Sequence, residues 1–186
     1  MTGTVLLQRA VVALELTFED ATACVRSGSA PGWVGGRGGA STVVTGDVTA
    51  ALAVATASGP GPAVVLWVQE ATDTAAAVGG IAVVRDGVTV AAYTWGAGEG
   101  QGGGDPEVAS VALVTALGTR TEAYVVRAYL RQDGDPLLMV AEVAALLDLD
   151  QQLAEILVAG PPDDFELVLG TAAGRQRWWR RQASSR

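Results

Sequence analysis

The chain has 186 residues, of which 49% are apolar and 17% charged, a composition typical of a globular protein that excludes a disordered one. Its 12 basic residues are all Arg and face 20 Asp and Glu, which gives a net charge of −8. With one Cys and neither His nor Lys, the sequence excludes a Ser-His-Asp or Cys-His nucleophile, a Walker A lysine, a Schiff base and an ordinary zinc site. Only carboxylate, Arg, hydroxyl and backbone chemistry remains open.

The N-terminal segment resembles neither a signal peptide nor a membrane span, because Arg9 and Glu15 interrupt its apolar residues. No other stretch reaches the ~18 apolar residues that a span needs. We therefore expect a soluble, cytoplasmic protein. The absence of Lys and Asn, whose codons are AT-rich, is typical of a GC-rich genome such as those of many actinobacteria.

The first elements in chain order are a strand and a short helix. Residues 11–26 show both helical and alternating apolar spacing, and Thr17 and Asp20 have the spacing of a capping box. A strand that leads into a helix from Thr17 to about Ser27, closed by Gly28, satisfies both patterns.

A glycine-rich segment follows at 27–42, and its composition predicts a mobile loop. Asp47 then predicts an N-cap for a helix over 48–57. The apolar run at 63–69 has the length of a buried strand. Asp86 and Gly87 separate two β-branched runs, which predicts a hairpin of 81–85 with 88–95.

The second half is expected to hold more helices than strands. Two Asp-Pro pairs predict helix starts, at Asp105 and at Asp135, and Asp150 predicts a third. The alternating segment 121–130 predicts a strand, and so does 165–170. Residues 175–179 could add an edge strand beyond it.

These elements predict an α+β fold with a mixed or largely antiparallel sheet, a central hairpin at 81–95 and three to five helices packed on it. We expect one domain over residues 1–174 and a basic C-terminal tail over 175–186, called the tail below.

The glycine-rich loop 96–104 offers one candidate site, because Gly98, Gly100 and Gly103 match the spacing G-x-G-x-x-G. Glu99 and Asp105 would place negative charge where a phosphate should bind. The loop also follows one arm of a hairpin instead of the first strand of a βαβ unit. We therefore expect a connector with no bound cofactor.

Carboxylates offer the second candidate. Asp133 and Asp135 could hold Mg²⁺ or activate a water, but Asp135 is also a helix cap, and we favour the cap. Asp163 and Asp164 are expected to form a solvated turn. Cys24 is expected to be a small core residue.

The tail is the third candidate, because it brings arginines and tryptophans together: Arg175, Arg177, Trp178, Trp179, Arg180 and Arg181. These residue types bind phosphates, bases or a bilayer interface, and they also anchor protein interfaces. The strongly acidic remainder of the chain opposes binding of a polyanion. We therefore expect no nucleic-acid or membrane partner, and predict that the tail makes protein contacts, within the chain or with an acidic partner.

A faint likeness to a known family supports an interaction role. The segment LELTFEDATACV, followed by IAVVRDGVTVAAYTWG and DPEVASVALVTALG, resembles in pattern the type VII secretion chaperones of actinobacteria. The resemblance rests on the order of a strand, a Thr-capped helix, a hairpin and a helix. It implies a protein that acts by binding another protein.

The sequence therefore predicts a non-enzymatic binding or accessory protein with a protein partner of unknown identity, and leaves a homo-oligomer open. A secretion-chaperone-like protein is one alternative. A small Mg²⁺- or nucleotide-dependent enzyme that uses 96–104, Asp133 and Asp135 is the other.

Overall fold

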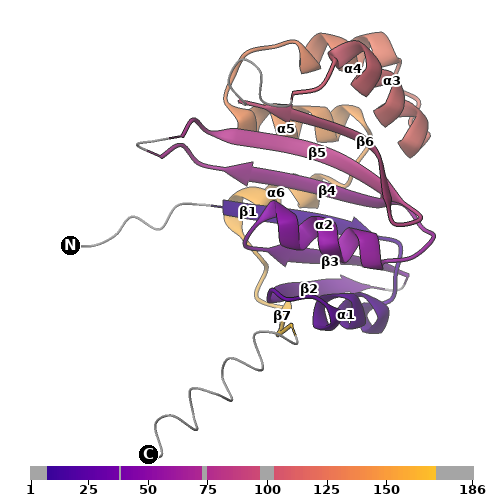
Figure 1. Ribbon diagram of the computed structural model, residues 1–186, viewed down its shortest axis with the longest axis vertical. Helices are drawn as coiled ribbons and strands as arrows, with labels where there is room; N and C mark the ends of the chain where they lie inside the picture. Colours follow the sequence, from indigo (N-terminus) through magenta and orange to yellow (C-terminus); the bar gives the residue numbers. More distant parts are fainter. Residues whose placement is uncertain (1–7, 38, 73–74, 97–102, 171–186) are drawn as a thin grey trace, which may run out of the picture.

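The computed structural model describes residues 8–37, 39–72, 75–96 and 103–170. Within these ranges the chain forms a seven-stranded sheet and six helices, an α+β architecture (Figure 1). The strands are β1 (Gln8–Leu14), β2 (Gly32–Arg37), β3 (Ala40–Thr45), β4 (Ala63–Gln69), β5 (Val78–Arg85), β6 (Val88–Trp95) and β7 (Glu166–Val168). The helices are α1 (Phe18–Ser27), α2 (Val48–Ala57), α3 (Pro106–Leu117), α4 (Ala123–Leu130), α5 (Pro136–Leu146) and α6 (Gln151–Ala159).

The strands lie in the order β6-β5-β4-β1-β3-β2-β7, and all neighbours are antiparallel. The central strands β1 and β4 pair over seven residues, from Gln8 opposite Gln69 to Leu14 opposite Ala63. The apolar run predicted at 63–69 is therefore confirmed as a buried interior strand. The two edges are β6 and β7.

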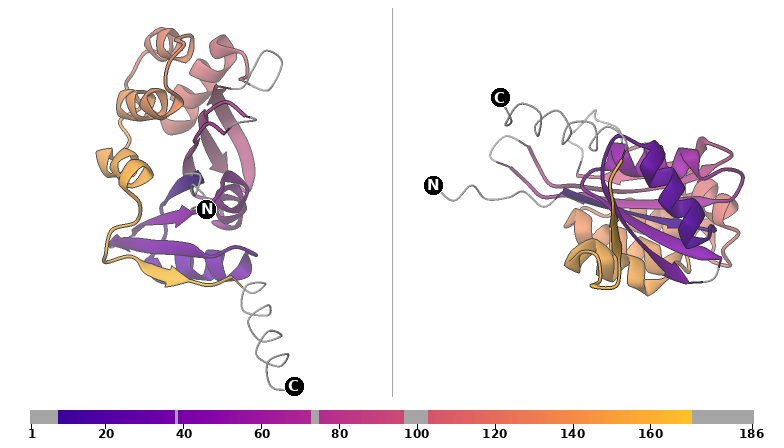
Figure 2. Two further views of the ribbon diagram at one scale, coloured as in Figure 1. Left: turned by 90° about the vertical axis from the view of Figure 1, so that its left-hand side faces the viewer. Right: turned by 90° about the horizontal axis from the view of Figure 1, so that it is seen from below.

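Helices cover both faces of the sheet, as the view from below shows (Figure 2). On one face α1 and α2 pack over side chains such as Val12, Val43 and Val65. On the other face α3, α4, α5 and α6 enclose a larger core that includes Leu66 and Ile81. Alternate residues of β1, β3, β4 and β5 thus enter opposite cores, which explains why these strands are apolar throughout.

Asp and Thr side chains start five of the helices, as predicted. Thr17 accepts a hydrogen bond from the backbone N–H of Asp20, and Asp47 accepts one from Ala50. Asp105, Asp135 and Asp150 each accept from the N–H two residues later, at 2.9 Å. These caps satisfy donors that the first helical turn leaves free.

The helices of the larger core are also held at their C-terminal ends by side chains from distant segments. Arg9 of β1 donates to the carbonyl oxygens of Leu157 and Val158, at 2.9 and 2.7 Å. Arg85 of β5 donates to Ala116 of α3 at 2.8 Å, and the Tyr93 hydroxyl donates to Leu130 of α4 at 2.6 Å. Because the C-terminal carbonyls of a helix carry partial negative charge, these donors bind the helices to the sheet.

The hairpin of β5 and β6 is confirmed and forms the β6 edge of the sheet. Asp86 and Gly87 have φ of 52° and 74°, the two positive values that a type I′ turn requires. A register shift between Val83 and Val84 marks a bulge in the pairing.

The strand predicted at 121–130 is wrong, because this segment forms α4. Its nearly continuous apolar residues fit either structure. In the fold, Val126 and Leu130 are buried one helical turn apart, and α4 packs mainly on α3 and α5. Packing on helices has overridden the β propensity of Tyr124 and Val125. The helix count is therefore six, above the expected three to five.

The mobile loop predicted at 27–42 is also wrong, because β2 and β3 form there. The glycines serve close packing in this sheet: a Cβ on Gly35 would lie 2.2 Å from Cε1 of Phe165, so the Phe165 ring rests directly on the Gly35 backbone. Composition alone made this segment resemble a loop.

None of the helices in the described ranges is long and apolar enough to cross a membrane.

Candidate interaction surface

The β7 edge carries apolar side chains on the face that also holds α3 to α6. Trp33 of β2 lies between two residues of its neighbouring strands, Leu167 of β7 on one side and Val44 of β3 on the other. Val44 belongs to the larger core, so all three side chains are on the face of that core. The exposed fractions of Trp33 and Leu167 are 39% and 46%, and Leu169 follows with 39%. We call Trp33, Leu167 and Leu169 the β7 strip.

The β7 strip is exposed because the helices of this face pack elsewhere. Contacts of α6 are with β1, β4 and β3, and α3 and α5 lie over the strands from β4 to β6. α1 contacts β2 and β7 as part of the smaller core on the opposite face. Exposed Trp and Leu side chains next to a strand edge that no described strand pairs with are a pattern that also occurs at protein-binding surfaces.

A groove of about 1080 Å³ lies next to the β7 strip on the same face. Its floor includes Ala13 and Val64, one wall is α6 with Leu153 and Ile156, and the Phe165 side chain separates it from the strip. The groove is therefore apolar at its base, and Phe165 borders it on the side of the β7 strip.

The rim of this groove is acidic, and we call it the acidic groove. The carboxylates that line it are Glu15, Asp150, Glu155, Asp163 and Asp164, all exposed. Arg85 is the one basic residue among the lining side chains described, and its guanidinium already donates to the Ala116 carbonyl. Such a rim attracts a cationic ligand. Asp163 and Asp164 form an exposed turn, as predicted, and that turn lines the groove.

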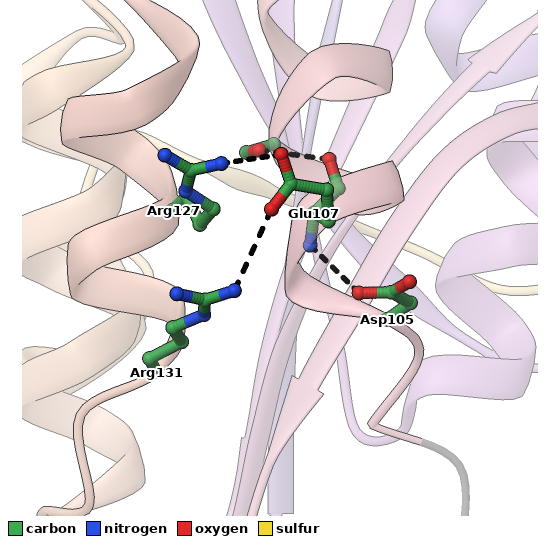
Figure 3. A network of polar contacts seen from close by, with 5 residues as sticks. Asp105, Glu107, Arg127 and Arg131 are labelled. Atoms are coloured by element: carbon green, nitrogen blue, oxygen red, sulfur yellow. Dashed lines mark hydrogen bonds and ion pairs between the residues drawn. The ribbon is translucent and has the colours of Figure 1, made fainter.

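A second polar cluster joins α3 to α4 (Figure 3). Glu107 forms ion pairs with Arg127 and with Arg131, the latter at 3.5 Å. Arg127 lies in the last turn of α4 and Arg131 is its C-cap residue, so the two arginines, four residues apart, lie on the same side of the helix end. Near them, Val108 and Val111 of α3 are also exposed. All three charges have partners, so this cluster holds two helices together.

The candidate magnesium pair does not converge on a metal site. The Asp135 side chain accepts from the N–H of Leu137 at 2.9 Å, which is the predicted N-cap. Asp133 is exposed, and its charge acts on Tyr93. Among the residues that the structure describes, no group of three or more His, Cys, Asp or Glu could hold a metal ion.

The described ends of the glycine loop serve packing. A Cβ on Gly96 would lie 2.0 Å from the carbonyl oxygen of Ala77 and 3.0 Å from Cγ of Pro136. The Asp105 carboxylate occupies the N–H of Glu107, at the helix end where a phosphate would have to bind. Residues 97–102, which carry Gly98 and Gly100, lie outside the described residues.

Burial raises the pKa of the Cys24 thiol, and the charge of Asp20 raises it further. The sulfur donates to the carbonyl oxygen of Ala57 at 3.5 Å, and the side chain packs against the smaller core. Cys24 therefore packs at the edge of the smaller core and is half-buried, whereas the sequence predicted a core position. Its raised pKa disfavours the thiolate.

The six tail residues predicted to make contacts lie outside the described residues: Arg175, Arg177, Trp178, Trp179, Arg180 and Arg181. Sequence reasoning missed the β7 strip, because Trp33 was assigned to a loop. The signal that could have found it is the β-branched run Thr42 to Thr45, which needed a partner strand nearby.

Comparisons with protein-family models, curated proteins and solved structures find no match to this chain. The elements that carried the likeness to secretion chaperones are present: β1 leads into the Thr17-capped α1, and the β5–β6 hairpin precedes α3. The likeness is one of element order, and a secretion-chaperone-like protein stays an alternative.

Proposed function

We propose that this chain is a non-enzymatic cytoplasmic binding or accessory protein whose partner is another protein. The observation that carries the proposal is the β7 strip, where Trp33 of β2 and Leu167 of the edge strand β7 lie opposite each other and are both exposed. Trp is the residue type most enriched among those that dominate binding energy at protein interfaces.

The edge itself supports the same proposal. Within the described residues β7 pairs with β2 alone, so its outer backbone groups face no described strand. A partner could add a strand there and place its own apolar side chains on the β7 strip. The acidic groove beside the strip would favour a partner segment that carries Arg or Lys.

The test is a comparison of two double variants in capture from an extract of the source cells. Trp33→Ser with Leu167→Ser removes the β7 strip. Val108→Ser with Val111→Ser removes exposed apolar side chains on α3, 65% and 53% exposed, and serves as the matched control. We expect proteins retained by the wild type to be lost from the first variant and kept by the second, as measured by quantitative mass spectrometry.

Identical capture by both variants and the wild type would contradict the proposal. The enzyme alternative has its own signature in a thermal-shift screen with nucleotides and Mg²⁺. A saturable rise in melting temperature that Asp133→Ala abolishes would favour the enzyme.

A further inference from the structure

We propose that the tail docks on its own molecule, with residues 175–181 returning along the free edge of β7 and placing Trp178, Trp179, Arg180 and Arg181 at the acidic groove. This docking goes beyond the proposed function and does not depend on the identity of a partner.

Charge complementarity is the first argument. Five carboxylates and one guanidinium line the acidic groove among the described residues, and that guanidinium is bound to a carbonyl. Both ion pairs in the described part of the chain involve Glu107, so none of the five carboxylates has an arginine partner there. The tail contains five arginines and no carboxylate side chain. Arg pairs with carboxylates in bidentate fashion.

Shape and polarity are the second argument. A rim of carboxylates over an apolar floor suits a segment that presents Trp and Arg together, because an indole can bury while neighbouring guanidinium groups remain at the rim. The groove volume of about 1080 Å³ is large enough for more than one such side chain. Phe165 at the groove edge offers a ring for stacking with an indole.

Reach is the third argument. β7 leads away from the groove: Phe165 lines it, and Gly170 lies at the other end, against the carbonyls of Gly28 and Ala30. Five residues of strand span roughly 17 Å. Trp178 is eight residues beyond Gly170, and eight residues reach roughly 27 Å, so the chain can turn and come back. Residues 171–174, TAAG, offer a glycine for that turn.

Return along β7 would also pair a strand edge that otherwise invites association with other chains. An antiparallel return that sets residues 175–177 beside Glu166 to Val168 would place Trp178 next to Phe165 and bring Arg180 and Arg181 toward Asp163 and Asp164.

The experiment is hydrogen–deuterium exchange of the full-length chain, followed by mass spectrometry of peptides from 171–186. We expect amides of 175–181 to exchange at least ~10-fold more slowly than an unstructured peptide of that sequence, independently of protein concentration. Asp163→Asn with Asp164→Asn should restore fast exchange. Glu122→Gln with Asp133→Asn, two exposed carboxylates away from the groove, should leave it slow.

Each other result overturns the docking. Fast exchange in the wild type would do so, and so would equal exchange in the two variants. Slowing that grows with protein concentration would instead report a second copy of the chain. Slowing that appears only after single-stranded RNA or anionic vesicles are added at ~100 mM salt would report a polyanion or a membrane. All four substituted side chains are exposed, so we expect both variants to fold. Their melting temperatures test this expectation. The exchange experiment needs no partner protein. The docking proposal can therefore fail while capture that depends on Trp33 and Leu167 succeeds, and it can succeed while that capture fails.

Discussion

The two edges of the sheet are built differently on the same face. At β6, the side chains of Ala91, Tyr93 and Trp95 enter the larger core, and the two rings meet edge to face with centroids 4.9 Å apart. At β7, Trp33 and Leu167 remain exposed and the strand has three residues. The larger core therefore takes in one edge and leaves the other free.

This difference separates apolar surface that stabilises the fold from apolar surface that remains exposed. Helices bound to the sheet through Arg85 and Tyr93 close the β6 edge, whereas the β7 edge leaves Trp33 and Leu167 exposed. Surface that is already buried stabilises the fold, and only exposed apolar surface can be buried in a complex.

The largest expected difference between the edges comes from removal of an apolar side chain at each. Leu113→Ala on α3 should cost ~2–5 kcal/mol of unfolding free energy, because the side chain is fully buried beside β6. Leu167→Ala on β7 should cost less than ~1 kcal/mol. Urea unfolding measures the free energy of unfolding of both variants, and equal losses would contradict the difference between the two edges.

A test of how β7 is held comes next. Gly35→Ala should cost ~1–3 kcal/mol, because the new Cβ would meet the Phe165 ring at 2.2 Å and push the segment before β7 off the sheet. Gly46→Ala is the control, since a Cβ there meets nothing within 4 Å. Thermal unfolding would detect the loss, and unchanged stability would show that Phe165 moves without consequence.

Tyr93→Phe sharpens the comparison at the β6 edge. Loss of the hydrogen bond to Leu130 should cost ~0.5–1.5 kcal/mol. Burial, and then the charge of Asp133, raise the pKa of Tyr93 in the folded protein. The folded state therefore holds the phenol proton more tightly than the unfolded state. The contribution of the Tyr93 hydroxyl to the free energy of unfolding is complete below pH ~10 and is lost as pH rises above that value.

Stability profiles of the wild type and Tyr93→Phe should therefore converge at alkaline pH. Tyr124→Phe is the control, because Tyr124 is exposed on α4. The raised pKa of Cys24 lowers the stability of the wild type and of every variant alike at alkaline pH. The difference in stability between Tyr93→Phe and the wild type therefore reports Tyr93 alone. A constant difference between pH 8 and 11 would contradict the assignment.

The smallest expected effect is at the ion pairs between α3 and α4. Glu107→Gln should cost ~0.2–1 kcal/mol, because both arginines and the carboxylate are partly exposed. The loss should shrink at ~1 M salt, where screening is nearly complete. Glu122→Gln, whose side chain makes no capping hydrogen bond, should change nothing.

The sequence by itself determined the local features. Asp47, Asp105, Asp135 and Asp150 marked helix starts, because an Asp acceptor before an apolar segment satisfies free backbone donors wherever the helix packs. Asp86-Gly87 marked the hairpin, because few residue pairs adopt positive φ twice in succession. These signals act within a few residues and need no tertiary partner.

Only the tertiary structure decided the elements whose signals conflict or depend on distant residues. Segment 121–130 is helical because α3 and α5 offer it a surface. Segment 32–45 forms strands because β1 and β7, both distant in sequence, pair with β3 and β2. The β7 strip and the acidic groove were hidden for the same reason. They combine residues from β1, β2, α6 and β7, which are brought together only by the order of strands in the sheet, and no local pattern specifies that order.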